Sequence, residues 1–197
     1  SVEPPTPMHT GVMAALTIRT SDGSETTVNG VWVSPAGYII TSTRAIENAG
    51  TMANDPNEVH PRLTIGCRHG DSSTTEAVLL RLLPPDLALL RVDLAPSAVA
   101  LPITTSAHEL PVGTRLHFTD ESAQPTAAIT GTLLQTYKPS QSGRSLLVTV
   151  DNPESVTIGS PVFTDGRVIG IVSSFERGAN GSSQVQVSSF SDLTFPE

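Results

Sequence analysis

Twelve short apolar runs constrain the fold of this chain more than any other feature of its sequence. The runs are rich in β-branched residues, often alternate between apolar and polar positions, and are separated by Gly, Pro, Asn, Asp and Ser. This pattern predicts β-strands rather than helices. The expected strands are Met13–Thr20, Val28–Ser34, Tyr38–Ser42, Leu63–Arg68, Thr75–Leu83, Leu87–Leu94, Leu116–Asp120, Ala128–Tyr137, Ser145–Asp151, Pro161–Thr164, Val168–Glu176 and Val185–Ser189.

The twelve runs divide into six and six, which predicts an all-β chain of two antiparallel barrels rather than one sandwich. Turn-forming residues at Ser34–Gly37, Asp71–Ser73 and Thr164–Gly166 lie between adjacent runs, as hairpins require. Helix is expected only over a turn or two after Thr43 and near Ser191–Leu193. The predicted division is an N-terminal linker at 1–12, a first barrel at 13–104, a connection at 105–112, and a second barrel at 113–197 with a short C-terminal helix.

Charge and cysteine content exclude several classes of protein. The formal net charge is −8, and the 11 Lys and Arg residues are scattered singly, which argues against nucleic acid as a partner. No apolar run approaches the roughly 20 residues of a membrane-spanning helix, so the domain itself is expected to make no membrane contact. The single cysteine, Cys67, excludes an intramolecular disulfide framework but leaves the cellular compartment open.

Three segments carry a resemblance to a known family. They are residues 37–46 (GYIITSTRAI), 85–90 (PDLALL) and 157–162 (TIGSPV), in that order. Together they resemble the HtrA-type branch of the trypsin-like serine peptidases. The resemblance implies two six-stranded barrels of the trypsin/chymotrypsin type, with a general base, an orienting aspartate and a nucleophile in the order His, Asp, Ser.

Carried over by position, the base falls on Arg44, the orienting carboxylate on Asp86 and the nucleophile on Ile158. A guanidinium has no acceptor lone pair and stays protonated, so Arg44 cannot accept a proton from a hydroxyl. The sec-butyl side chain of Ile158 has no nucleophilic atom. The resemblance therefore implies a catalytically degenerate member, a pseudoprotease that is not an enzyme.

The loop around the nucleophile position also departs from the family pattern. The family glycine that contributes an N–H to the oxyanion hole falls on Val156, Gly159 keeps the first glycine after the nucleophile, and the second falls on Ser160. A β-branched valine resists the unusual backbone angles of a glycine, so a misshapen oxyanion hole is expected. Ile158 is expected to cap the former catalytic pocket.

Two interpretations of Arg44 are open. A bidentate pair with Asp86 would replace the His–Asp hydrogen bond and close the old site. Alternatively, Arg44 contacts an anion or another ligand.

Two other functions compete with a pseudoprotease. A rewired hydrolase would use Ser155 or Ser160, but Arg44 would still stand where a base is required, and all five histidines lie elsewhere in the sequence. A metal-binding module would use the pairs His60/His69 and His108/His117. A nine-residue separation is not a recognised spacing of metal ligands, however, so these residues are expected to be surface histidines. Neither a metal nor a cofactor is expected.

The leading function is a non-catalytic module that binds, scaffolds or regulates a peptide or protein partner. Trypsin-like folds bind substrate as an added strand on the second barrel through backbone groups that do not depend on the triad. The peptide edge is expected at Ile171, Val172, Ser173, Ser174 and Phe175, with the base of the side-chain pocket near Asn152.

The resemblance also implies a location. Members of the family mostly work outside the cytoplasm, often behind an N-terminal membrane helix and ahead of a PDZ domain. An extracytoplasmic or periplasmic site is therefore expected. The proline-rich start, Ser1–Pro7, would suit the linker from a missing anchor, and no PDZ domain follows the second barrel within the 197 residues.

Overall fold

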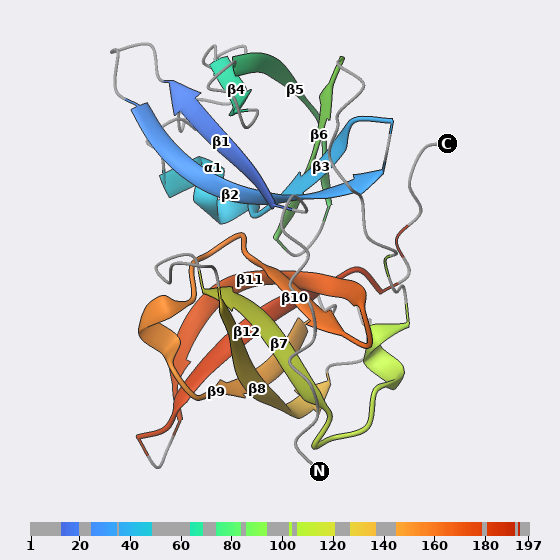
Figure 1. Cartoon of the computed structure of the whole chain (residues 1–197), viewed down its shortest axis with the longest axis vertical. Coiled ribbons are helices and arrows are strands. Elements are labelled where there is room, and N and C mark those ends of the chain that lie inside the picture. The colour runs from blue at the N-terminus through green and yellow to red at the C-terminus, as the bar shows by residue number, and fades with distance from the viewer. Residues whose placement is uncertain are drawn as a thin grey trace.

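The computed structural model describes residues 13–19, 25–34, 36–48, 64–68, 74–83, 86–93, 103, 106–120, 127–136, 145–178, 181–191 and 193. Within them, every expected run overlaps one strand of an antiparallel barrel, which confirms the all-β fold class (Figure 1). The strands are β1 (Met13–Arg19), β2 (Glu25–Ser34), β3 (Tyr38–Thr41), β4 (Thr64–Arg68), β5 (Thr74–Leu83), β6 (Leu87–Val92), β7 (Arg115–Asp120), β8 (Ala127–Thr136), β9 (Ser145–Val150), β10 (Pro161–Thr164), β11 (Arg167–Arg177) and β12 (Ser183–Ser189).

Both barrels close. The first has the strand order β1-β2-β3-β6-β5-β4, and its ends meet because β1 also pairs with β4, as in Leu16 opposite Cys67. The second has the order β10-β11-β12-β9-β8-β7 and closes where Val162 of β10 faces Phe118 of β7. Six short strands can close because bulges bend several of them, including one in β11 between Val172 and Ser174.

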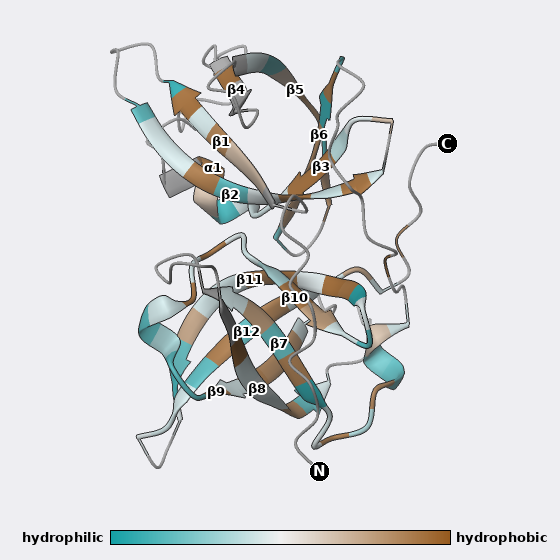
Figure 2. Cartoon of the chain, in the orientation of Figure 1, coloured by the Kyte–Doolittle hydropathy of each residue, from teal (hydrophilic) through white to brown (hydrophobic). Residues whose placement is uncertain are grey.

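Three apolar clusters hold the two barrels as one body. One cluster fills the first barrel around Leu16 and Trp32, and another fills the second around Phe118 and Leu133. The third joins residues of both barrels, with Ile40 from the first and Phe190 from the second in the same cluster. The hydropathy colouring shows apolar segments along the strands of both barrels (Figure 2). The interface between the two barrels is therefore a hydrophobic core of its own, and close packing holds the segments that meet there in position.

Strand β2 starts three residues earlier than the apolar pattern predicts. Glu25, Thr26 and Thr27 are exposed and polar, yet they pair with Arg19, Ile18 and Thr17 of β1. An ion pair between Arg19 and Glu25 joins the end of this pairing. A hydrophobic pattern cannot reveal a hairpin extension that buries no apolar surface.

Helix is scarce, as expected. The helix α1 (Thr43–Asn48) confirms the turn predicted after Thr43, whereas the 3-10 helices η1 (Ala107–Glu109) and η2 (Pro153–Ser155) are too short to have been predicted. Near the C-terminus, Ser191 lies in a turn and the N–H of Leu193 donates to Phe190, while Asp192 is outside the described residues. In the part of the chain that the structure describes, none of the helices is long or apolar enough to cross a membrane.

Candidate functional site

Three segments that are distant in sequence come together between the barrels: the β3–α1 junction, the turn before β6, and residues 151–160. The side-chain amide of Asn29 on β2 donates to the Thr157 hydroxyl at 2.8 Å, which ties the loop of the second barrel to the first barrel. The Thr41 hydroxyl donates to the backbone carbonyl of Asn29 at 2.7 Å. Helix α1 lies on the side of the first barrel that faces the second (Figure 1). The structure therefore brings the segments that the sequence singles out to one place.

Asp86 is buried at this site, and both of its carboxylate oxygens have donors. Oδ2 accepts the Ser42 hydroxyl at 2.7 Å, and Oδ1 accepts the backbone N–H of Arg44 at 2.8 Å. The backbone N–H of Thr43 donates to the Asp86 carbonyl at 3.3 Å. Ser42 also caps α1, because its hydroxyl oxygen accepts the N–H of Ala45 at 3.3 Å. Asp86 thus anchors the start of α1 to the turn before β6.

The expected side-chain pair between Arg44 and Asp86 is wrong. The Arg44 side chain is exposed, and among the side chains that the structure describes its guanidinium has no ion-pair partner. The contact between the two residues runs through the Arg44 backbone instead. The Arg44 side chain extends to the surface, and the buried carboxylate takes the Ser42 hydroxyl and the Arg44 N–H as its donors.

The oxyanion position is closed by a backbone hydrogen bond. Val156 has φ −98° and ψ 131°, an ordinary extended conformation, so the backbone strain expected for a valine here does not arise. Its N–H donates to the carbonyl of Pro153 at 3.2 Å, and its side chain is buried in the core of the second barrel. This N–H is therefore already engaged and does not point at a site for a developing oxyanion.

Gly159 holds the loop against the first barrel. Its φ is +88°, and a Cβ built there would lie 2.3 Å from the carbonyl oxygen of Asn29 and 3.5 Å from the Thr41 hydroxyl. Its N–H donates to the carbonyl of Val172 at 2.8 Å. The neighbouring Ile158 is half-buried, so its expected role in capping the pocket stays a prediction.

Neither alternative serine is placed as a nucleophile. Ser160 is fully buried, and its hydroxyl is hydrogen-bonded to that of Thr157 at 2.6 Å. The Ser155 hydroxyl accepts the Asn152 side-chain amide at 3.2 Å. Neither serine has a hydrogen bond to a histidine among the described residues, so neither has an activated geometry.

The histidine pairs do not form a metal site in the described part of the chain. His60 and His69 lie outside the described residues. His108 is in η1, with Nε2 4.0 Å from a carboxylate oxygen of Glu109, and His117 is in β7 opposite Thr130 and Phe163. Within the described ranges, no three His, Cys, Asp or Glu side chains gather as metal ligands would.

The predicted peptide edge begins later than expected. Ile171 is paired on both sides, with Pro161 and Ser188, so it is not at an edge. Val172 is also engaged, because its N–H donates to the Ser160 carbonyl at 3.0 Å and its carbonyl accepts from Gly159. These two residues were expected in the edge because the sequence does not show how far the preceding loop pairs with β11.

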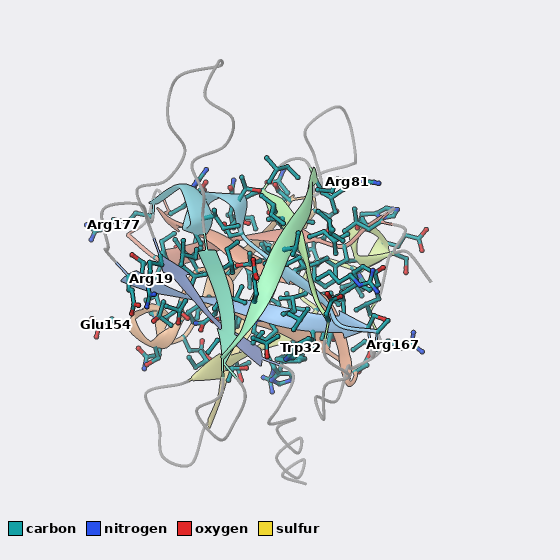
Figure 3. All side chains as sticks on the ribbon, turned by 90° about the horizontal axis from the view of Figure 1, so that it is seen from above. Arg19, Trp32, Arg81, Glu154, Arg167 and Arg177 are labelled. Carbon is teal, nitrogen blue, oxygen red and sulfur yellow. The ribbon has the colours of Figure 1, made fainter. Side chains whose placement is uncertain are left out.

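From Ser173 onward, β11 pairs only with β12 within the described residues. Its register there runs from Ser174 opposite Gln186 to Arg177 opposite Ser183. Ser173 is buried and its hydroxyl bonds that of Ser188, whereas Ser174 is half-buried and Phe175 is exposed. Arg167 and Arg177, at the two ends of β11, lie on opposite sides of the molecule (Figure 3). The free edge, defined here as Ser173–Arg177, is therefore the half of β11 remote from Arg167.

Asn152, which is expected near the base of the side-chain pocket, lies on the surface. It is exposed and precedes η2, and its amide bonds Ser155. The proline after it starts a 3-10 turn, and this turn keeps Asn152 on the surface.

The residues that sequence reasoning missed are Ser42, Asn29 and Thr157. Ser42 carried a readable signal, because a serine directly before a short predicted helix is a typical N-cap. Asn29 and Thr157 carried none, since their hydrogen bond joins positions 128 residues apart.

Comparisons with known proteins agree with this fold. A model of the trypsin-like peptidase domain matches residues 28–171. No curated protein matches the sequence. The chain is similar to the active form of the Rv3671c protease from M. tuberculosis, at 14% identity and a TM-score of 0.64, over 92% of this chain and 77% of that one.

Two further solved structures show the same fold. The HtrA-type protease AlgW with a tripeptide aligns at 17% identity and a TM-score of 0.62, over 91% of this chain and 56% of that one. Deg5 aligns at 17% identity and a TM-score of 0.60, over 84% of this chain and 81% of that one. The match to the family model spans more than half of the chain and includes positions 44, 86 and 158. This chain therefore belongs to the family of trypsin-like peptidase domains.

Proposed function

We propose that this chain is a non-catalytic member of its family that binds an extended segment of a peptide or protein partner. The observation that carries the proposal is the side chain at the base position: Arg44 presents an exposed guanidinium, and only its backbone N–H reaches the Asp86 carboxylate. In an active triad this carboxylate orients the base, and the base activates the nucleophile. Here Arg44 has no lone pair to act as a base and Ile158 has no nucleophilic atom.

The binding part of the proposal rests on the free edge Ser173–Arg177. A strand edge presents unpaired N–H and carbonyl groups to an added strand, and these groups need no catalytic residue. The similar HtrA-type protease AlgW was solved with a tripeptide and with a decapeptide, and this chain covers 56% and 60% of those two chains. We place the protein outside the cytoplasm, in keeping with its resemblance to HtrA-type proteases, and its acidic charge argues against a nucleic-acid partner.

The first test is covalent labelling with a fluorophosphonate probe, together with release of fragments from fluorescent casein. The wild-type protein is expected to give neither. The double variant Arg44→His/Ile158→Ser, which restores the two reactive side chains, is also expected to stay unlabelled. The reason is that the N–H of Val156, which an oxyanion would need as a donor, would still be bonded to the carbonyl of Pro153.

Trypsin measured in parallel is the positive control, and circular dichroism checks that the double variant is folded. Stoichiometric labelling of the wild type at Ser155 or Ser160, mapped by mass spectrometry, would overturn the proposal.

A second test concerns the free edge. The polar backbone groups of Val172 face away from β12, and Ser173 is the extra residue of the bulge. The alternation of an antiparallel ladder then turns the N–H and carbonyl of Phe175 outward as well. Phe175→Pro removes this outward N–H and is expected to weaken binding of a peptide selected from a display library at least tenfold.

The matched control is Phe175→Ala, which removes the exposed ring but keeps the N–H. If the edge binds through its backbone, the alanine variant loses less affinity than the proline variant in isothermal titration. Equal affinity of Phe175→Pro and the wild type would show that the peptide binds elsewhere.

A further inference from the structure

Arg44 has a chemical capacity that the proposed function does not yet use. Its guanidinium is exposed and has no ion-pair partner among the side chains that the structure describes. Its backbone is fixed, because its N–H donates to the buried Asp86 carboxylate at 2.8 Å. One exposed arginine is ordinary on a protein surface, so the argument depends on where this one stands.

The contacts of the site link the segment that carries Arg44 to one end of the free edge. Thr41, three residues before Arg44, lies against Gly159, since a Cβ at Gly159 would be 3.5 Å from the Thr41 hydroxyl. Gly159 in turn bonds the carbonyl of Val172 at 2.8 Å, and the free edge starts at the next residue, Ser173. The start of α1, which carries Arg44, is therefore connected through Thr41 and Gly159 to the Ser173 end of the edge, and Arg177 is at the other end.

The same contacts limit how far a bound strand can pair. Both polar groups of Val172 are already bonded to Gly159 and Ser160. A peptide added along the edge thus loses its pairing partners at Ser173 and has to end or turn away there. Where the strand pairing stops beside a charged side chain, the terminal group of the bound peptide lies next to that charge.

Strand direction decides which end of the peptide this is. A peptide antiparallel to β11 runs from Arg177 toward Ser173, so its C-terminus arrives near Arg44. A parallel peptide would bring its N-terminus instead, and its ammonium group would be repelled by the guanidinium. A carboxylate matches the guanidinium in charge and in its two-donor geometry.

We propose, on the basis of the peptide-binding role above, that the ligand is an extended peptide with a free C-terminus whose carboxylate pairs with Arg44. At the position where the family has a base that transfers protons, Arg44 would thereby recognise the C-terminus of a peptide. A segment of this kind is exposed at the C-terminus of a protein or is produced by cleavage elsewhere. An internal segment of a folded chain lacks the carboxylate.

The test uses one array of decapeptides of mixed sequence, synthesised once with free C-terminal carboxylates and once with C-terminal amides. Wild-type protein is expected to bind its best sequences roughly fivefold more tightly as acids than as amides, as a largely exposed ion pair allows. In Arg44→Gln this preference for the acid is expected to vanish, and in Arg44→Glu it is expected to reverse. Affinities of the selected peptides are measured by fluorescence anisotropy at low and high salt, because salt weakens an exposed ion pair.

Arg167→Gln is the matched control, because Arg167 is also an exposed arginine but lies at the end of β11 that is outside the free edge (Figure 3). It is expected to keep the full acid preference. Equal binding of acids and amides by the wild type, or a preference that survives in Arg44→Gln, would overturn the carboxylate proposal and leave peptide binding standing. Absence of binding to both forms of the array would overturn peptide binding itself.

Discussion

Gly159→Ala is expected to destabilise the protein by about 2 to 5 kcal/mol, the sum of a left-handed backbone strain and a steric overlap. The new Cβ would lie 2.3 Å from the carbonyl oxygen of Asn29 at a φ of +88°. Neither side can move easily, because Asn29 is paired with Ala15 in the first barrel and Gly159 is bonded to Val172 in the second. Chemical denaturation followed by tryptophan fluorescence measures the loss, since Trp32 is the single tryptophan.

The chain offers a close control for this substitution. Gly113 has a φ of +91°, nearly the same as that of Gly159, but nothing lies within 4 Å of a Cβ built on it. Gly113→Ala therefore carries the backbone strain alone and is expected to cost about 1 to 2 kcal/mol. The difference between the two variants isolates the contact between the barrels.

If the two alanine variants lose the same stability, the loop that contains Gly159 is not in close contact with Asn29 of β2, in contrast to the structure. A greater loss for Gly159→Ala should be accompanied by a change in amide exchange at Asn29 and Val172, the two residues that hold Gly159 in place. This readout separates release of the loop from a general loss of stability.

The fold could be predicted from the sequence because its main signal is local. Alternation of apolar and polar residues marks each strand, and the turn residues between runs mark where each strand ends. The errors fall where burial gives no signal, as at the exposed start of β2 from Glu25 to Thr27. Three-residue helices such as η1 and η2 are also invisible to any periodic pattern.

The candidate site was predictable in position but not in its hydrogen bonds. The motifs located Arg44, Asp86 and the loop at Ile158, and the structure brings their segments together between the barrels. The sequence could not tell that Asp86 would be held by the Ser42 hydroxyl and the Arg44 N–H, because opposite charges at two aligned positions suggest a side-chain pair. Nor could it show that Gly159 and Ser160 would occupy the polar groups of Val172.

The same contacts separate what the fold needs from what catalysis needs. Asp86 and Gly159 both have structural roles in this chain. Asp86 holds the start of α1, and Gly159 packs between the barrels. At the base and nucleophile positions, by contrast, the Arg44 side chain is exposed and the Ile158 side chain is half-buried. Their chemistry could therefore be replaced without loss of the fold.

This division predicts that Asp86→Ala destabilises the protein by about 2 to 4 kcal/mol, as expected when a buried charged acceptor is removed from two donors. The Ser42 hydroxyl and the Arg44 N–H would both lose their acceptor. Asp93→Ala is the control, because Asp93 is exposed at the end of the same hairpin and a change there is expected to stay within about 0.5 kcal/mol. Thermal and urea unfolding of the three proteins give the comparison.

Ser42→Ala completes a double-mutant cycle with Asp86→Ala. Alone, it removes a helix cap and one donor to the carboxylate, for about 1 to 2 kcal/mol. The double variant is expected to lose about 1 kcal/mol less than the sum of the two single losses, because each change removes a group that the other leaves unpaired. Strict additivity would mean that the two side chains do not interact, and Asp86 would then be held by the Arg44 N–H alone.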